Sequence, residues 1–297
     1  MAAQGIWAAM SVPRERKAEI EHDGVSAIKK EFAEHGQDDE DWRPDDGFGS
    51  DQRRLDYILN GKATFHKQAN GAIRDRHPGG RLNLTLDDFV KMPQARDAGL
   101  EKAHVLALRL YTSNSYSCIN GPLRKVADIR AAEKKQMEED QKFGRPVQSP
   151  KLLAPHPFAA TTYYISDALK KLRANLADGG IQDRVFWRGM ANMGANEMFF
   201  DKGGTEMGCM STTADEAVAR KFAKVGTRGE KPLLLKVVAK DHMSCGADIS
   251  WLSMYPEEKE VLYPPLTYLQ PNAIEGQAVG TDPGEVTVIT LSPTYPT

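Results

Sequence analysis

Apolar residues recur every three or four positions between about residue 52 and residue 176. This spacing places them on one face of an α-helix, so the pattern predicts a helical region. The signal is clearest in two runs: Leu100, Ala103, Ala107 and Leu110, followed by Ile165, Ala168, Leu169, Leu172 and Leu176. Thr85 and Asp88 have the spacing of a weak capping box, and Gly121-Pro122 predicts a break in the helices.

The pattern changes after Gly179-Gly180, where short apolar runs replace the helical repeat. Such runs predict strands, and the run at 233–238 is apolar on both faces, as in a buried strand. The predicted strands cover 185–189, 233–238, 260–263, 267–269 and 285–291, and one helix lies among them at 215–224. Because the helices come first and the strands later, the pattern predicts an α+β fold rather than alternating βαβ units.

Three regions therefore follow one another along the 297 residues of the chain. Residues 1–50 end in an acidic stretch rich in turn formers, so we expect a poorly ordered extension. We expect residues 51–178 to form a helical subdomain and residues 179–297 to form a β-rich core.

Composition and charge argue against several classes of protein. A net charge of −2 gives no reason to expect nucleic acid or an anionic membrane as a partner, and no apolar run approaches the roughly 20 residues of a membrane span. The seven histidines and three cysteines are scattered, so we expect no metal site and no disulfide framework. The N-terminus lacks a cationic residue before its short apolar patch, which predicts a cytoplasmic protein, or one exported without such a signal. A monomer is expected.

Arg188 interrupts an aromatic strand, Phe186-Trp187, and Gly189 follows it. A guanidinium group can donate to two phosphate oxygens at once, and a glycine lets a flat ligand approach the backbone closely. The alternative is an arginine at the edge of a sheet, whose stem covers apolar surface or which pairs with an acid.

Three hydroxyl residues, Ser211, Thr212 and Thr213, precede the helix predicted at 215–224. Thr213 and Glu216 fit a capping box, which would give Thr213 a structural role. Ser211 lies too far from the helix start to cap it, so its hydroxyl can bond another group.

Two carboxylates, Glu258 and Glu260, stand two positions apart at the start of the strand predicted at 260–263. Side chains alternate along a strand, so we expect both carboxylates to face one space and Lys259 to face away. Two like charges this close are unfavourable unless a cationic group or a cationic transition state uses them. The alternative is an exposed strand with alternating charges.

The order Arg188, Ser211, Glu258-Lys-Glu260 resembles the R-S-E class of mono-ADP-ribosyltransferases, and the resemblance extends from about residue 96 to 295. Four blocks carry it: RLYTSNSYSCINGPLR at 109–124, FWRG at 186–189, GCMSTTADEAVARKFA at 208–223 and EEKEVLYPP at 257–265. Thr213 departs from the family pattern, which usually has a second serine there. The resemblance implies an ADP-ribosyltransferase fold, in which a helical subdomain precedes two small twisted sheets that form a cleft for NAD.

The resemblance also implies a role for each polar residue. Glu260, oriented by Ser211, would bind the ribose and stabilise a developing ribosyl cation. Arg188 would hold the diphosphate, and the backbone of Gly189 would meet the nicotinamide carboxamide. Glu258 would bind the acceptor and take its proton, which favours arginine as the acceptor. Further contacts are expected with NAD from Thr212, Phe199 and Phe200, and with the acceptor from Trp251 and Tyr255. Core packing is the alternative for the phenylalanine rings, and a packed turn is the alternative at Tyr255.

The implied activity is NAD-dependent mono-ADP-ribosylation of arginine side chains on a protein, with release of nicotinamide and without a metal. Two alternatives stay open: an NAD glycohydrolase that uses water as the acceptor, and a non-catalytic module that binds NAD or a protein. Chain-elongating poly-ADP-ribosyltransferases use a His-Tyr-Glu triad, and no histidine lies on the strand predicted at 185–189, which argues against that class.

Overall fold

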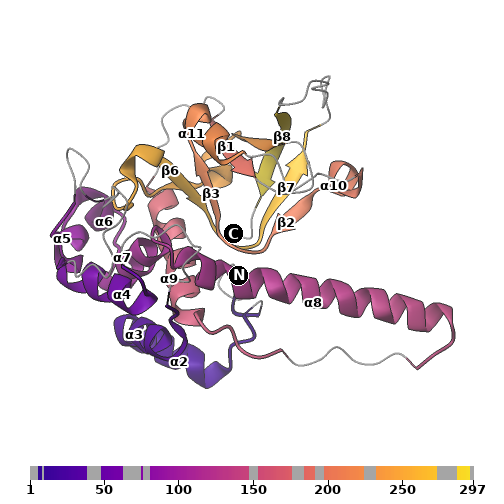
Figure 1. Cartoon of the computed structure of the whole chain (residues 1–297), viewed down its shortest axis with the longest axis horizontal. Coiled ribbons are helices and arrows are strands. Elements are labelled where there is room, and N and C mark those ends of the chain that lie inside the picture. Colours follow the sequence, from indigo (N-terminus) through magenta and orange to yellow (C-terminus); the bar gives the residue numbers. More distant parts are fainter. Residues whose placement is uncertain are drawn as a thin grey trace.

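Helices precede strands along the chain, as the sequence predicts (Figure 1). The computed structural model describes residues 6–8, 10–38, 48–62, 75, 81–146, 153–175, 184–190, 197–223, 232–272 and 286–294. The helices that precede the strands are α2 (Arg14–His22), α3 (Gly24–His35), α4 (Asp51–Asn60), α5 (Leu86–Val90), α6 (Pro93–Asp97), α7 (Lys102–Tyr111), α8 (Tyr116–Lys142) and α9 (Ala159–Ala174). None of the described helices is both long and apolar enough to cross a bilayer.

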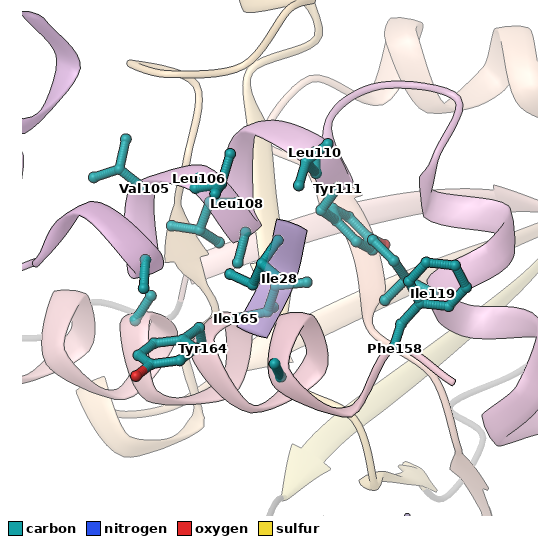
Figure 2. Close-up of a cluster of buried hydrophobic side chains, with 14 of the residues drawn as sticks. Ile28, Val105, Leu106, Leu108, Leu110, Tyr111, Ile119, Phe158, Tyr164 and Ile165 are labelled. Carbon is teal, nitrogen blue, oxygen red and sulfur yellow. The ribbon is translucent and has the colours of Figure 1, made fainter. Parts of the chain in front are cut away.

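Helix α7 lies at the centre of the helical half. Every residue from 103 to 111 is buried, so other elements surround this helix on all sides. Figure 2 shows Leu106 and Leu108 of α7 close to Ile28 of α3 and to Ile165 of α9. The apolar repeats that predicted helices here therefore mark the faces that form this core. The capping box at Thr85, at the start of α5, is confirmed.

The N-terminal extension was expected to be poorly ordered, and this expectation is wrong for residues 10–38. Helices α2 and α3 lie there, and Ile28 is buried in the same core as α7. The Glu31 carboxylate of α3 accepts a hydrogen bond from the backbone N–H of Ala160 at 2.6 Å and so caps the start of α9. The expectation gave too much weight to the acidic stretch, of which residues 39–47 lie outside the described part of the chain, and too little to the apolar repeat of α3.

Pro122 does not break the helices, because α8 continues through it. A proline inside a helix lacks an N–H donor and crowds the carbonyl four residues earlier, which costs local stability. Ile119 and Leu123 flank it and are fully buried, so their packing offsets this cost. Beyond this point α8 extends away from the other helices (Figure 1).

The strands form one mixed sheet in the order β2-β7-β8-β4-β1-β3-β6-β5. Their bounds are β1 (Arg184–Met190), β2 (Gly204–Glu206), β3 (Met210–Thr213), β4 (Leu233–Ala239), β5 (Ala247–Asp248), β6 (Glu260–Tyr263), β7 (Thr267–Pro271) and β8 (Thr287–Thr294). β4 and β8 are parallel and the other pairs are antiparallel. Within the described residues, β1 pairs with β3 through Trp187 and Thr213 alone, so the sheet divides there into two small parts, as the family resemblance implies. The predicted domain boundary at 178–179 lies outside the described residues.

The two faces of strand β1 have different neighbours: one lies against a helix, and the other carries the buried Phe186. Two short helices, α10 (Glu197–Lys202) and α11 (Glu216–Phe222), lie between the strands of this half. A Cβ atom on Gly189 would come within 2.0 Å of the carbonyl oxygen of Ala219 in α11, so only glycine fits at this position. Because side chains alternate along a strand, Arg188 points to the opposite face, the one that carries the buried Phe186.

Candidate active site

Arg188, Ser211 and Glu260 come together where β1, β3 and β6 lie side by side. The guanidinium Nη1 of Arg188 donates to the backbone carbonyl of Ser211 at 2.9 Å. The antiparallel register pairs Ser211 with Leu262 and Thr213 with Glu260. Ser211 and Glu260 are therefore diagonal neighbours on one face of the sheet, and the Ser211 hydroxyl donates a hydrogen bond to the Glu260 carboxylate.

Glu260 is a buried acid, with 7% of its surface exposed. Burial raises the pKa of Glu260 to about 7, and the negative charge of Glu258 adds to this rise. Hydrogen bonds from the Ser211 and Ser253 hydroxyls and the charge of Arg188 act in the opposite direction. A buried carboxyl group poised near neutral pH, with specific charged partners, is typical of a catalytic site.

Glu258 lies near Glu260, but not for the reason that the sequence suggests. β6 begins at Glu260, and Glu258 ends a short 3-10 helix, η3 (Pro256–Glu258). Lys259 between them adopts a left-handed conformation, with φ of 47°, so the alternation of side chains along a strand does not apply here. The Lys259 ammonium turns toward the Asp215 carboxylate, 3.2 Å away, as an exposed ion pair. The two glutamates therefore meet through a turn, and the lysine between them points elsewhere.

A third carboxylate, that of Glu206 in β2, lies between two arginines. Nε and Nη2 of Arg124 in α8 donate to its two oxygens at 3.0 and 3.2 Å. Nη2 of Arg188 lies 3.9 Å from the same carboxylate. Guanidinium groups from the helical half and from the sheet therefore converge on one anion, a geometry that also suits phosphate.

The two threonines after Ser211 belong to the scaffold of the sheet. Thr212 is buried, and its hydroxyl donates to the carbonyl of Val261 at 2.6 Å. It points to the face opposite Ser211, so the structure does not bring it together with Glu260. The predicted capping box at Thr213 is wrong in detail, because Asp215 caps α11 and the Thr213 hydroxyl accepts a hydrogen bond from the backbone N–H of Asp215.

The four aromatic residues that were expected to contact NAD or the acceptor are half-buried. Phe199 and Phe200 of α10 pack against the core of the sheet, with ring centroids 6.3 Å apart in an edge-to-face arrangement. Trp251 and Tyr255 pack against the helical core. Each ring therefore has a packing role, and contacts with NAD or with an acceptor stay predictions.

Sequence reasoning missed three residues of this site. Arg124 stands at the end of the block at 109–124, so a cation at a fixed place in that block was the available signal. Glu206 ends β2 and Ser253 lies in the segment before β6, and neither belongs to the four blocks that carry the resemblance. Glu206 is bound by Arg124, 82 residues away, and the Ser253 carbonyl is bound by Arg81, 172 residues away, so local patterns do not report them.

Comparisons with known proteins give one family match and several similar solved structures. A model of the ADP-ribosyltransferase exoenzyme family matches residues 94–280. The chain is similar to the solved structure of the ADP-ribosyltransferase HopU1 of Pseudomonas syringae pv. tomato DC3000, with 18% identity over 69% of this chain and 85% of that chain and a TM-score of 0.45. It is similar to exoenzyme S of Pseudomonas aeruginosa, solved with human 14-3-3 protein beta and carba-NAD, with 21% identity over 70% and 86% of the two chains and a TM-score of 0.41. Its similarity to the type III effector XopAI of Xanthomonas axonopodis pv. citri covers 95% of this chain and 92% of that chain, with 12% identity and a TM-score of 0.40. No curated protein sequence matches significantly.

The family match spans more than half of the chain, from α6 to a point beyond β7. It includes Arg188, Ser211, Glu258 and Glu260, the residues on which the R-S-E resemblance rests. The chain belongs to the ADP-ribosyltransferase exoenzyme family.

Proposed function

We propose that this protein cleaves NAD between nicotinamide and ribose and transfers the ADP-ribosyl group to an arginine side chain of another protein. The observation that carries the proposal is the buried Glu260 carboxylate, which two serine hydroxyls hold and whose pKa the nearby Glu258 charge helps to raise. Cleavage of a glycosidic bond makes the sugar carbon cationic, and fixed negative charge beside that carbon lowers the barrier.

Glu260 acts on the nicotinamide ribose. Its carboxylate accepts a hydrogen bond from the ribose 2′-hydroxyl and stabilises the positive charge that develops at C1′. The bond between C1′ and the nicotinamide nitrogen breaks, and the bonding electron pair leaves with neutral nicotinamide. The Ser211 and Ser253 hydroxyls, which both donate to Glu260, keep its carboxylate in place during this step.

Two arginines hold the diphosphate of NAD. Arg188 and Arg124 already share one carboxylate, that of Glu206, so their guanidinium groups are close enough to share a diphosphate. The diphosphate competes with Glu206 for these donors. Gly189 meets the nicotinamide carboxamide through the edge of its backbone, since α11 covers its α-carbon. Phe199 and Phe200 supply a ring against which nicotinamide stacks.

Glu258 acts on the acceptor. It is half-buried at the end of η3, with Trp251 and Tyr255 earlier in the same loop. A carboxylate binds a guanidinium group through two parallel hydrogen bonds, which favours arginine over other acceptors. An acceptor nitrogen attacks C1′ to form the new bond, and the proton that it loses goes to Glu258.

NAD cleavage should depend on pH through Glu260. Because its pKa is raised to about 7, the free enzyme carries a protonated, inactive carboxyl group below that pH. We expect kcat/KM for NAD to rise with pH and to level off above about 7, with a slope that approaches tenfold per pH unit on the acid side. In the Glu258→Gln variant the midpoint should move to lower pH, because a charge that raises the Glu260 pKa is gone. A flat profile between about pH 5 and 8 would contradict the assignment.

The proposal is tested with labelled NAD, agmatine as a guanidino acceptor, and a cell lysate. We expect nicotinamide release, labelled agmatine, and labelled proteins whose modified residue is identified as arginine by mass spectrometry. Nicotinamide release at one rate with and without agmatine, with no label on protein, would instead assign NAD hydrolysis. A folded preparation without NAD turnover would assign a binding role.

A further inference from the structure

Arginines outside the catalytic group hold the segment that leads into Glu260. Residues 249–259 connect β5 to β6, and we name this segment the acceptor loop. Nη2 of Arg81 donates to the carbonyl of Ser250 at 2.7 Å, and Nη1 of Arg81 donates to the carbonyl of Ser253 at 2.6 Å. Nη1 of Arg109 donates to the carbonyl of Leu252, between them, at 2.8 Å. One side of the loop backbone is therefore fixed by two guanidinium groups.

The Arg109 side of this arrangement is rigid. Arg109 is fully buried in α7, and its Nη2 lies 2.7 Å from the Asp75 carboxylate. The Tyr57 hydroxyl of α4 donates to the same carboxylate at 2.7 Å. The centroid of the Phe89 ring, in α5, lies 4.5 Å from the guanidinium carbon of Arg109. A buried charge with this many partners has little freedom to move. Arg109 therefore fixes Leu252, and Arg81 adds the contacts on either side.

Ser253, whose backbone carbonyl is bound by Arg81, also contacts Glu260 through its side chain. The Ser253 hydroxyl donates to the Glu260 carboxylate and accepts a hydrogen bond from the backbone N–H of Tyr255 at 3.1 Å. Ser253 is fully buried, so it has little room to shift without moving its neighbours. A displacement of the loop backbone at Ser253 is therefore transmitted through Tyr255 to Glu258, whose backbone N–H donates to the Tyr255 carbonyl at 3.0 Å. Glu260 belongs to β6 and keeps its hydrogen bond from Ser211, so the same displacement affects it less.

We propose that Arg81 is a positioning residue, which sets the geometry of the acceptor loop and with it the efficiency of transfer to a guanidinium acceptor. This inference rests on the proposed transferase function. Arg81 and Asp75 both precede residue 94, where the family match begins. The segment before the family domain therefore takes part in acceptor recognition by bracing the loop that carries Glu258.

The loss of Arg81 should affect the acceptor more than NAD. Its removal leaves the Ser250 and Ser253 carbonyls without their donors, and the loop then samples other positions. Glu258 sits at the far end of the loop, whereas Arg188 and Ser211 lie on strands that the loop does not carry. Misplacement of a catalytic group by about 1 Å can cost roughly 100-fold in rate. The expected cost at Arg81 is a loss of about 10- to 100-fold in kcat/KM for the acceptor.

Three variants of this chain test the positioning role of Arg81. They are Arg81→Ala, Arg81→Lys and, as a matched control, Arg96→Ala at an exposed arginine of α6. In Arg81→Ala, transfer to agmatine should fall at least about 10-fold, while KM for NAD and nicotinamide release without acceptor change less than about threefold. Arg81→Lys should recover part of the transfer, because an ammonium group can still donate to these carbonyls. Equal losses in transfer and hydrolysis, or wild-type transfer in Arg81→Ala, would overturn the proposal.

Hydrogen exchange gives a reading that does not depend on activity. Peptides that cover residues 249–259 should exchange faster in Arg81→Ala than in the wild type or in Arg96→Ala, while peptides from α9 keep their wild-type rates. Unchanged exchange in the acceptor loop would overturn the positioning role whatever the activity. If the acceptor loop exchanges faster in Arg81→Ala but the wild-type protein does not modify agmatine, the positioning of the loop by Arg81 stands. In that case only the proposed transferase function is refuted.

Discussion

Replacement of Glu260 by glutamine is expected to lower NAD hydrolysis and ADP-ribosyl transfer together, by on the order of 1,000-fold. Glutamine keeps the size of the side chain and can still accept a hydrogen bond, but it carries no charge. The cationic ribose then loses the negative charge that stabilises it, and both reactions share that step. Nicotinamide release and agmatine labelling, measured in the same preparation, check this result.

The same variant should be no less stable than the wild type at pH 8. The pKa of Glu260 is about 7 in the folded protein and 4.5 without the effects of burial, so the folded state binds the proton more tightly. The contribution of Glu260 to the free energy of unfolding is therefore fully present below pH 4.5 and is lost as the pH rises through about 7. Above pH 7 the charged form costs on the order of 1–3 kcal/mol, and glutamine does not bear that cost. A stable, folded Glu260→Gln variant that still cleaves NAD at the wild-type rate would refute the catalytic role.

Replacement of Glu258 by glutamine is expected to separate the two activities. Transfer to agmatine should fall about 100-fold or more, because the acceptor loses both its charged partner and the base that takes its proton. NAD hydrolysis should stay within about threefold of wild type, since water needs less activation and Glu260 remains in place. The measurement is the ratio of labelled agmatine to free nicotinamide at saturating NAD.

Glu257 supplies the matched control for this separation. It is the preceding residue of η3 and is exposed, so Glu257→Gln changes the same charge one position away. We expect this variant to keep the wild-type ratio of transfer to hydrolysis. If Glu257→Gln and Glu258→Gln behave alike, the effect comes from the charge of the turn as a whole, and the specific role of Glu258 is wrong.

The signals that predicted the fold are local ones. The apolar repeat that includes Ile165 and Leu169 predicts α9 by itself, and the run at 233–238 predicts β4. The order of the strands could not be predicted in this way, because the parallel pairing of β4 with β8 joins segments that are distant in sequence. At Pro122 the local rule gave the wrong result, since the burial of its neighbours outweighs the cost of proline in a helix.

The site shows the same limit. The resemblance of Arg188, Ser211 and Glu260, in that order, to the R-S-E family was enough to predict that they lie together. The relation between Glu258 and Glu260 was inferred from strand alternation, and the left-handed Lys259 replaces that strand with a turn. Ser253 reaches Glu260 through a loop whose path depends on distant side chains, so no local pattern could have predicted the contact.

A structure of the protein with a non-cleavable NAD analogue such as carba-NAD shows whether Glu260 meets the nicotinamide ribose. We expect the ring 2′-hydroxyl of the analogue at a hydrogen-bonding distance, about 2.6–3.2 Å, from a Glu260 oxygen. We also expect the diphosphate beside Arg188 and Arg124, with Glu206 displaced from both. An analogue bound elsewhere, or with its nicotinamide side far from Glu260, would refute the role of Glu260 in NAD cleavage.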